Sequence, residues 1–241
     1  MNQLTKVLYQ EQFRWFLWFL LFVLLFQGAL LALAFYFEGT IQPFILLSFG
    51  PSRIFLLVLG IISAYAFLGY YYQLGQTRKR YYKSTIVSSI LLAVTMAFIV
   101  KLLSLIEAFV VGNQSVISDQ TEGTTIANDS QSITITIDIF SEGLQFLDSS
   151  LLFMLFFVLQ LLFYYAVGWF ISVGFYRYGW VIGLVFIVFA LGFLGLNQSM
   201  WSSSLVDDLP AILQFIGTGA LVTIVFSFVY LVVKRTPIKL K

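Results

Sequence analysis

Two groups of residues in this sequence have side chains that could perform specific chemistry beside apolar segments. The first is a basic turn, Gly75-Gln76-Thr77-Arg78-Lys79-Arg80-Tyr81-Tyr82-Lys83, which has four positive charges in nine residues. Such a turn can bind anionic lipid headgroups, or it can present a basic face to a partner protein. The second group is Lys101 and Glu107, at the end of an apolar segment. These two side chains are candidates for a substrate path, although the Lys101 amine can also reach the membrane surface by snorkelling.

The sequence lacks the side chains that most enzyme mechanisms need. It has no Cys and no His, which excludes thiol nucleophiles, Cys/His zinc sites and His-ligated haem. It also lacks the G-x-x-x-x-G-K-[ST] loop and a G-x-G-x-x-G motif between a strand and a helix. We therefore expect a protein that is not an enzyme, binds no metal or cofactor itself and does not bind nucleic acid. Any ATP must be bound by another chain.

The composition indicates that a bilayer surrounds most of the chain. Of the 241 residues, 60% are apolar and 10% are charged, whereas a soluble domain carries about 25% charged residues. Six segments have the length of about 20 apolar residues that a membrane span needs. All four prolines fall at the ends of these segments or between them, where no interior helical hydrogen bond is lost. The predicted spans are 15–37, 54–74, 85–106, 150–174, 180–196 and 210–233.

The charge distribution predicts the orientation of these spans. With the N-terminus inside, 11 of the 13 basic residues and one of the 11 acidic residues fall on the cytoplasmic side, as the positive-inside rule requires. Arg53 and Lys101 are the two basic exceptions. An even number of spans places both termini on one side. The predicted fold class is therefore an all-α integral membrane protein, a single domain over residues 1–241 with six transmembrane helices and both termini cytoplasmic.

Three polar segments lie outside the predicted spans. Residues 1–14 suggest a short amphipathic helix along the inner surface, with a frayed tail as the alternative. Residues 107–149 form an external acidic loop with seven acids and no basic residue. Within the loop, residues 132–139 alternate with period two and predict a short β element, while 113–131 is a poorer candidate for order. Residues 234–241 form a basic cytoplasmic tail.

Uncharged polar and small residues inside the spans predict contacts between helices. The amides of Gln27, Gln160 and Gln214 should bridge helices, because an amide in hydrocarbon needs a hydrogen-bond partner. Small residues allow two helices to approach closely. The candidates for such contacts are Gly179, Gly183, Gly192, Gly195, Gly217, Gly219 and Ala220.

The six-span arrangement and two inner turns resemble the ABC-2 type permeases, the membrane subunits of bacterial ATP-binding-cassette (ABC) exporters. In that family a Gly-x-[Ser/Thr]-Arg-[Lys/Arg] stretch commonly follows the second span, and Gly75-Gln76-Thr77-Arg78-Lys79 has this form. A second similar element is Phe175-Tyr176-Arg177-Tyr178-Gly179-Trp180, between the fourth and fifth spans. One feature departs from the family: many members have their main external elaboration after the fifth span, whereas here the long external loop follows the third.

The resemblance implies a permease subunit in the bacterial plasma membrane, nearest to small permeases that export or confer immunity to amphipathic peptides. Such a subunit pairs with a second permease copy, identical or different, and with cytoplasmic ABC ATPases that bind ATP and Mg²⁺. The near absence of charge inside the spans favours a hydrophobic or amphipathic substrate, a peptide or a lipid. The implied ATPase-coupling residues, with the two tyrosines at 81 and 82 as aromatic anchors, are Gly75, Thr77, Arg78, Lys79, Arg80, Tyr81, Tyr82, Tyr176 and Arg177.

A second function stays open on the sequence alone. The acidic loop, with a charge of −7, would attract a cationic peptide by long-range electrostatic steering. The chain would then be a non-transporting immunity or sensor protein. The two functions make different demands, because a permease needs an ATPase on its inner turns and an external binder does not.

Overall fold

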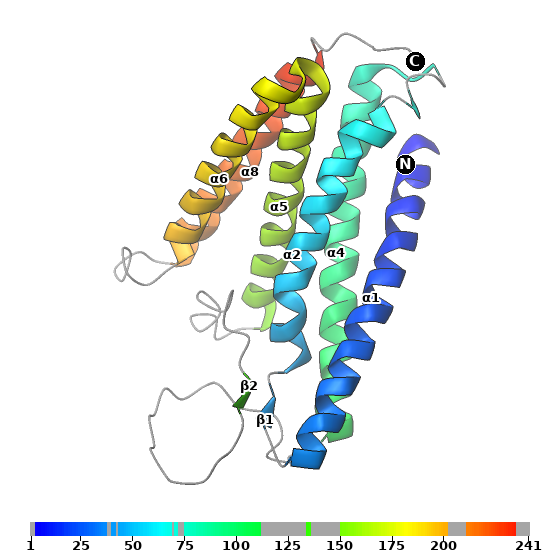
Figure 1. Cartoon of the computed structure of the whole chain (residues 1–241), viewed down its shortest axis with the longest axis vertical. Coiled ribbons are helices and arrows are strands. Elements are labelled where there is room, and N and C mark those ends of the chain that lie inside the picture. The colour runs from blue at the N-terminus through cyan, green and yellow to red at the C-terminus, as the bar shows by residue number, and fades with distance from the viewer. Residues whose placement is uncertain are drawn as a thin grey trace.

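The computed structural model describes residues 3–37, 40–41, 43–68, 70–71, 75–111, 134–135, 150–201 and 211–234. This part of the chain is almost entirely helical, and six of its helices are long and apolar enough to cross a membrane (Figure 1). The prediction of six spans is confirmed. In chain order these helices are α1 (Gln3–Phe37), α2 (Phe44–Ile62), α4 (Arg78–Val111), α5 (Ser150–Tyr178), α6 (Trp180–Trp201) and α8 (Ala211–Lys234).

The second span begins ten residues earlier than predicted. Helix α2 starts at Phe44, and Pro51 lies inside it, so the prediction that every proline falls outside the spans was wrong. The stretch Gly50-Pro51-Ser52-Arg53 has the composition of a turn at a membrane surface, yet all four residues are helical. A proline is tolerated in a span where neighbouring groups satisfy the carbonyl that it leaves free. After α2 the chain continues as a π-helix, η1 (Ser63–Leu68).

Helix α1 is one continuous helix of 35 residues. A separate surface helix was predicted over residues 1–14. The described part of that segment, which starts at Gln3, is instead the beginning of α1. Leu4, Leu8 and Gln12 recur every fourth residue and are buried, so one face of these turns packs against the bundle rather than lying on a membrane surface.

Helix α5 lies at the centre of the bundle. In its most apolar stretch 61% of the residues are buried, compared with 17% in α1 and in α6. It lies between α2 on one side and α6 and α8 on the other (Figure 1). The large apolar faces of α1 and α6 remain exposed, as expected for helices that meet lipid or another membrane subunit.

The crossing of α2 and α5 brings two backbones into contact. A Cβ atom at Gly60 would lie 2.2 Å from the Tyr165 carbonyl oxygen, and one at Gly168 would lie 2.1 Å from the Leu57 carbonyl oxygen. Neither glycine was among the predicted contact residues. Of those that were, Gly183 and Gly217 meet the side chains of Phe175 and Met200, whereas nothing lies within 4 Å of the Cβ position of Gly192, Gly195 or Gly219.

A two-residue pairing joins the α1–α2 connection to the segment that was predicted to be an acidic loop. Strand β1 (Thr40–Ile41) runs parallel to β2 (Thr134–Ile135), with Thr40 opposite Thr134. Two residues of the predicted β element are thus paired. The rest of 132–139 lies outside the described residues, as do 113–131 and 235–241, so an external strand over the whole segment stays a prediction.

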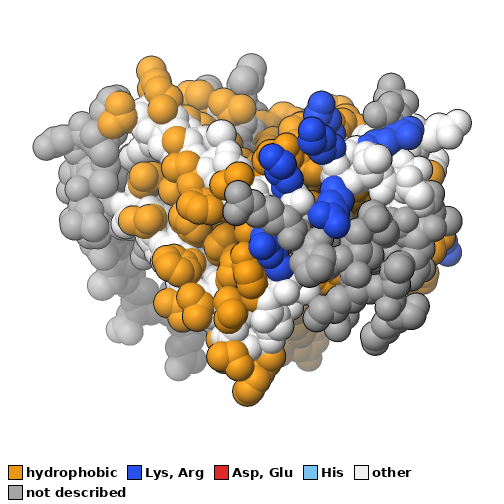
Figure 2. Space-filling view, turned by 90° about the horizontal axis from the view of Figure 1, so that it is seen from above, with side chains coloured by type: hydrophobic (Ala, Val, Ile, Leu, Met, Phe, Trp, Pro, Cys, Tyr) orange, Lys and Arg blue, Asp and Glu red, His pale blue; other side chains and the backbone are white. Residues whose placement is uncertain are grey.

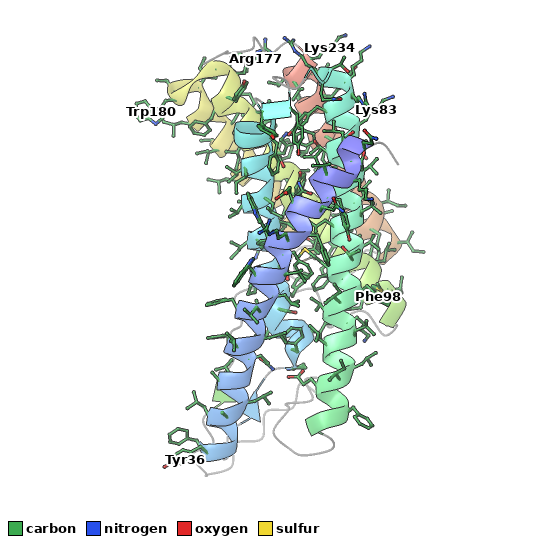
Figure 3. All side chains as sticks on the ribbon, turned by 90° about the vertical axis from the view of Figure 1, so that its right-hand side faces the viewer. Tyr36, Lys83, Phe98, Arg177, Trp180 and Lys234 are labelled. Carbon is green, nitrogen blue, oxygen red and sulfur yellow. The ribbon has the colours of Figure 1, made fainter. Side chains whose placement is uncertain are left out.

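The bundle has one strongly basic end. Helices α1 and α4 begin there and α5 and α8 finish there, which brings together Lys6, Arg78, Lys79, Arg80, Lys83, Arg177 and Lys234. Figure 3 labels Arg177, Lys234 and Lys83 at this basic end and Tyr36 at the opposite end. The structure thus places residues from both family-like turns at the same end.

We predict that Gly168→Ala destabilises the protein, because its new methyl group meets backbone rather than a movable side chain. Overpacking of this kind costs about 1–3 kcal/mol. The measurement is the melting temperature of the purified chain in detergent. The matched control is Gly192→Ala, whose Cβ meets no atom within 4 Å. Equal melting temperatures for the two variants would contradict the close α2–α5 crossing.

Candidate functional site

The Gly-x-Thr-Arg motif forms the start of α4. Gly75 has φ +75°, a left-handed conformation that side chains disfavour. The Gln76 N–H donates to the Tyr71 carbonyl at 3.1 Å and closes the turn. Thr77 is the N-cap residue, because its hydroxyl accepts from the Arg80 N–H at 3.3 Å. The basic residues that follow are therefore the first turns of a 34-residue helix, rather than a loop or a separate short helix.

Two arginines of the predicted site bind the end of α8. Arg78 of α4 donates to the Lys234 carbonyl at 3.0 Å, and Arg177 of α5 donates to the Val232 carbonyl at 3.2 Å. The last carbonyls of a helix have no partner within the helix and carry partial negative charge. The two predicted coupling turns are thus joined through one turn of a third helix.

The exposed side chains at the start of α4 are Lys79, Arg80 and Lys83. Successive residues of a helix are turned by about 100°, so Lys79 and Lys83 share one face and Arg80 lies at the edge of that face, next to Lys83. Figure 2, seen from the basic end, shows Lys and Arg side chains gathered beside apolar side chains. Tyr176 is partly exposed on the last turn of α5.

Tyr81 is packed inside the chain, and Tyr82 is half-buried against neighbouring helices. Tyr81 is 2% exposed, and its hydroxyl donates to the Ser63 carbonyl of η1. The ring of Tyr82 stacks on Trp169 at 5.5 Å, and its hydroxyl donates to the Phe226 carbonyl at 2.9 Å. An aromatic anchor for a partner must be accessible before the partner binds. We therefore remove Tyr81 from the proposed partner contact and assign it to packing, whereas Tyr82 is partly exposed and stays a predicted contact.

A buried polar network surrounds the π-helix η1. The hydroxyls of Ser63 and Tyr165 are 2.6 Å apart, and the Tyr165 hydroxyl accepts from the Gln12 side chain at 3.2 Å. Ser88 donates to the Gln12 side-chain oxygen at 2.8 Å. The network joins α1, η1, α4 and α5. The sequence did not predict this network, because Gln12 lies in the segment that was expected to form a surface helix. The pattern that could have revealed it is that Gln12 follows Leu8 by four residues, so both lie on the same buried face of α1.

One titratable group beside the basic turn has a shifted pKa. Burial raises the pKa of Tyr71, and the negative charge of Glu11 adds to this effect. In the described part of the chain, no group of three or more Asp or Glu residues could hold a metal ion.

Glu107 joins three helices at the opposite end. One carboxylate oxygen accepts from the Gln27 side chain of α1 at 2.5 Å, and the other accepts from the Phe44 N–H at 2.6 Å. Phe44 opens α2, so the carboxylate satisfies an N–H that has no partner within the helix. The predicted Gln27 bridge is confirmed, and so is that of Gln160, which pairs with Asn197 of α6 at 2.9 Å.

Lys101 does not share the position of Glu107. It is partly exposed on α4, and six residues turn a helix by about 600°, so the two side chains point to different sides. Glu107 is thus placed as a connection between helices, and the predicted translocation path through both residues stays a prediction.

Arg53 is a buried charge that the sequence analysis left at the membrane surface. It is 8% exposed on α2, with its guanidinium 4.1 Å from the ring centre of Phe49 and 5.3 Å from that of Tyr164. Cation–π contacts of this kind stabilise a cation that is away from water. The sequence feature that could have predicted this position is the apolar run before Gly50. With this run included, the second span begins at Phe44 and contains Arg53.

Comparison of the chain with protein-family models, with characterised proteins and with solved structures found no match. The likeness to ABC-2 permeases therefore depends on the two motifs and the six-span arrangement.

We predict that Glu107→Ala destabilises the chain more than Glu107→Gln. Alanine leaves the Phe44 N–H and the Gln27 amide without their acceptor, at a cost of about 1–3 kcal/mol, whereas glutamine keeps one acceptor oxygen. Thermal unfolding in detergent measures the difference. Glu11→Ala, at an exposed acid on α1, is the matched control. An equal effect of Glu11→Ala and Glu107→Ala would contradict the connecting role.

Proposed function

We propose that this chain is the membrane-spanning permease subunit of an ABC exporter that moves a hydrophobic or amphipathic substrate, a peptide or a lipid. A separate cytoplasmic ATPase binds ATP and Mg²⁺, and a second permease copy completes the translocation path. One observation carries the proposal: the two turns that resemble the family lie at one end, and Arg78 and Arg177 bind the same last turn of α8.

This arrangement has the mechanical property that ATP-driven transport requires. A displacement of the start of α4 is passed to α8 through the hydrogen bond of Arg78. It is passed on to α5 because Arg177 of α5 donates to the same turn of α8. It also travels along α4, which rises by about 1.5 Å per residue and so spans about 44 Å from Arg78 to Glu107. At Glu107 the carboxylate is bonded to α1 and α2. Movement imposed by the ATPase at one end would thus alter helix positions at the other.

The proposed ATPase contact consists of the exposed residues of the two turns. Gly75 and Thr77 are exposed before α4, and Lys79 and Arg80 are exposed on its first turn. Tyr82 on α4 and Tyr176 on α5 are partly exposed. Exposed ion pairs contribute about 0–1 kcal/mol each, so Arg80 orients the ATPase more than it provides affinity. In this proposal the chain lies in the bacterial plasma membrane with both termini cytoplasmic, and the basic end then faces inside, as the positive-inside rule favours.

We predict that a cysteine at position 80 is labelled only after the membrane is permeabilised. The chain has no native Cys, so each substitution reports a single site. The comparison is Phe109→Cys at the opposite end, where the native side chain is 90% exposed; it should react with an impermeant maleimide in intact cells. The reverse pattern would overturn the orientation.

We also predict that Arg80→Glu lowers the amount of ABC ATPase that is recovered when the permease is purified from its own membranes. The expected loss is about tenfold or more, because the new carboxylate would face acidic residues of the ATPase. Mass spectrometry identifies and quantifies the ATPase. Lys6→Glu is the matched control, an equal charge reversal at an exposed position of α1. If both variants retain the ATPase equally at the same expression level, the coupling assignment is wrong.

A further inference from the structure

An open groove of about 520 Å³ lies between α4 and α8 at the basic end. Its lining consists of Lys79, Tyr82, Lys83, Ser227, Tyr230 and Leu231. The floor is held in place, because the Tyr82 ring lies 5.0 Å from that of Tyr230 and stacks on buried Trp169. Of the three exposed basic residues at the start of α4, Lys79 and Lys83 line the groove and Arg80 does not.

The charges of this groove favour a negative occupant. Lys79 and Lys83 are four residues apart on one helix face, where like charges repel. They also lie in the first turns of α4, where the helix dipole disfavours cations and favours anions. Among the described residues the only acids are Glu11 on α1 and Glu107 at the far end of α4, so neither neutralises the pair.

The depth of the groove matches the boundary between lipid headgroups and acyl chains. The 24 residues of α8 extend over about 36 Å at about 1.5 Å per residue, compared with about 30 Å for the hydrocarbon core of a bilayer. The end of α8 at Lys234 therefore reaches the headgroup region. The groove residues of α8 lie between one and two turns before that end.

Exposed apolar stripes continue from the groove along both helices. On α4, Val87, Ile90 and Val94 follow Lys83 on the same face and are 41–45% exposed. On α8, Ile224 and Phe228 are exposed beside Ser227 and Leu231. An occupant that fits the whole surface combines a small anionic head with apolar chains.

We propose that this groove binds an anionic phospholipid of the phosphatidylglycerol type. Its phosphate lies between the amines of Lys79 and Lys83, the Tyr230 side chain borders the headgroup, and the acyl chains follow the apolar stripes. Basic pockets between transmembrane helices recognise anionic headgroups in this way. The bound lipid removes the repulsion between the two lysines and strengthens the contact of α4 with α8.

The experiment is native mass spectrometry of the full chain in detergent without any ATPase, so its result is independent of the proposed transport function. The probes are phosphatidylglycerol, zwitterionic phosphatidylethanolamine and soluble glycerol phosphate. We expect adducts of phosphatidylglycerol and about 30-fold weaker binding by Lys79→Gln with Lys83→Gln, since each lysine near an anionic headgroup contributes about 1 kcal/mol. Lys6→Gln with Arg14→Gln, at two exposed positions of α1 that do not line the groove, should retain binding.

A second variant tests the groove without removing charge. Ser227→Trp fills the cavity and should displace the lipid while both lysines remain. Equal adducts of the two phospholipids, or unchanged binding by the lysine variant, would overturn the proposal. Binding of glycerol phosphate as strong as that of the lipid would assign the site to a free phosphate. Conversion of a dimer to a monomer by the lysine variant, with lipid adducts unchanged, would assign the groove to a second copy and equally overturn the proposal.

Discussion

Helices in hydrocarbon must satisfy their backbone polar groups without water, and the connections of this bundle follow from that requirement. At several places in the described part of the chain, a side chain from one helix binds a backbone group of another. Glu107 accepts from the first N–H of α2, Arg78 and Arg177 donate to the last carbonyls of α8, and Tyr81 donates to a carbonyl of η1. These bonds join helices that are distant in sequence. The hydrogen bonds that satisfy backbone groups therefore also determine which helices move together.

Helix α4 contributes to most of these connections. It binds α8 through Arg78 and Tyr82, η1 through Tyr81, and α1 through Ser88 and Glu107. Since its hydrogen-bond ladder runs without a proline from Arg78 to Val111, it can transmit displacement along its axis. Helix α2 is different: it contains Pro51 and leads into the π-helix η1. Irregular helical turns of this kind often accompany functional movement, and the polar network at Ser63 holds this one in place.

Hydropathy was sufficient to predict six spans, because their length and composition depend on the bilayer rather than on packing. It misplaced α2, since a window average cannot distinguish a Gly-Pro-Ser-Arg turn from a buried stretch in which Arg53 rests on aromatic rings. The third span was predicted to begin at residue 85, whereas α4 begins at Arg78. The local signals for this start were Gly75, which has a left-handed conformation, and Thr77, a good N-cap residue. Which residues after Thr77 are buried depends on tertiary contacts, so the burial of Tyr81 was not predictable locally.

The helical period explains how six consecutive residues serve different surfaces. Arg78 and Tyr82 are four residues apart and both reach α8, whereas Tyr81 points to η1. Lys79 and Lys83 form the next face, beside the groove, and Arg80 lies outside both sets. The residues after Thr77 therefore form a packing face and an adjoining exposed face, on which Lys79 and Lys83 line the groove and Arg80 lies at its edge. Because a stiff helix fixes the angles between these residues, a partner that displaces Arg80 also displaces Tyr81 and the two lysines of the groove.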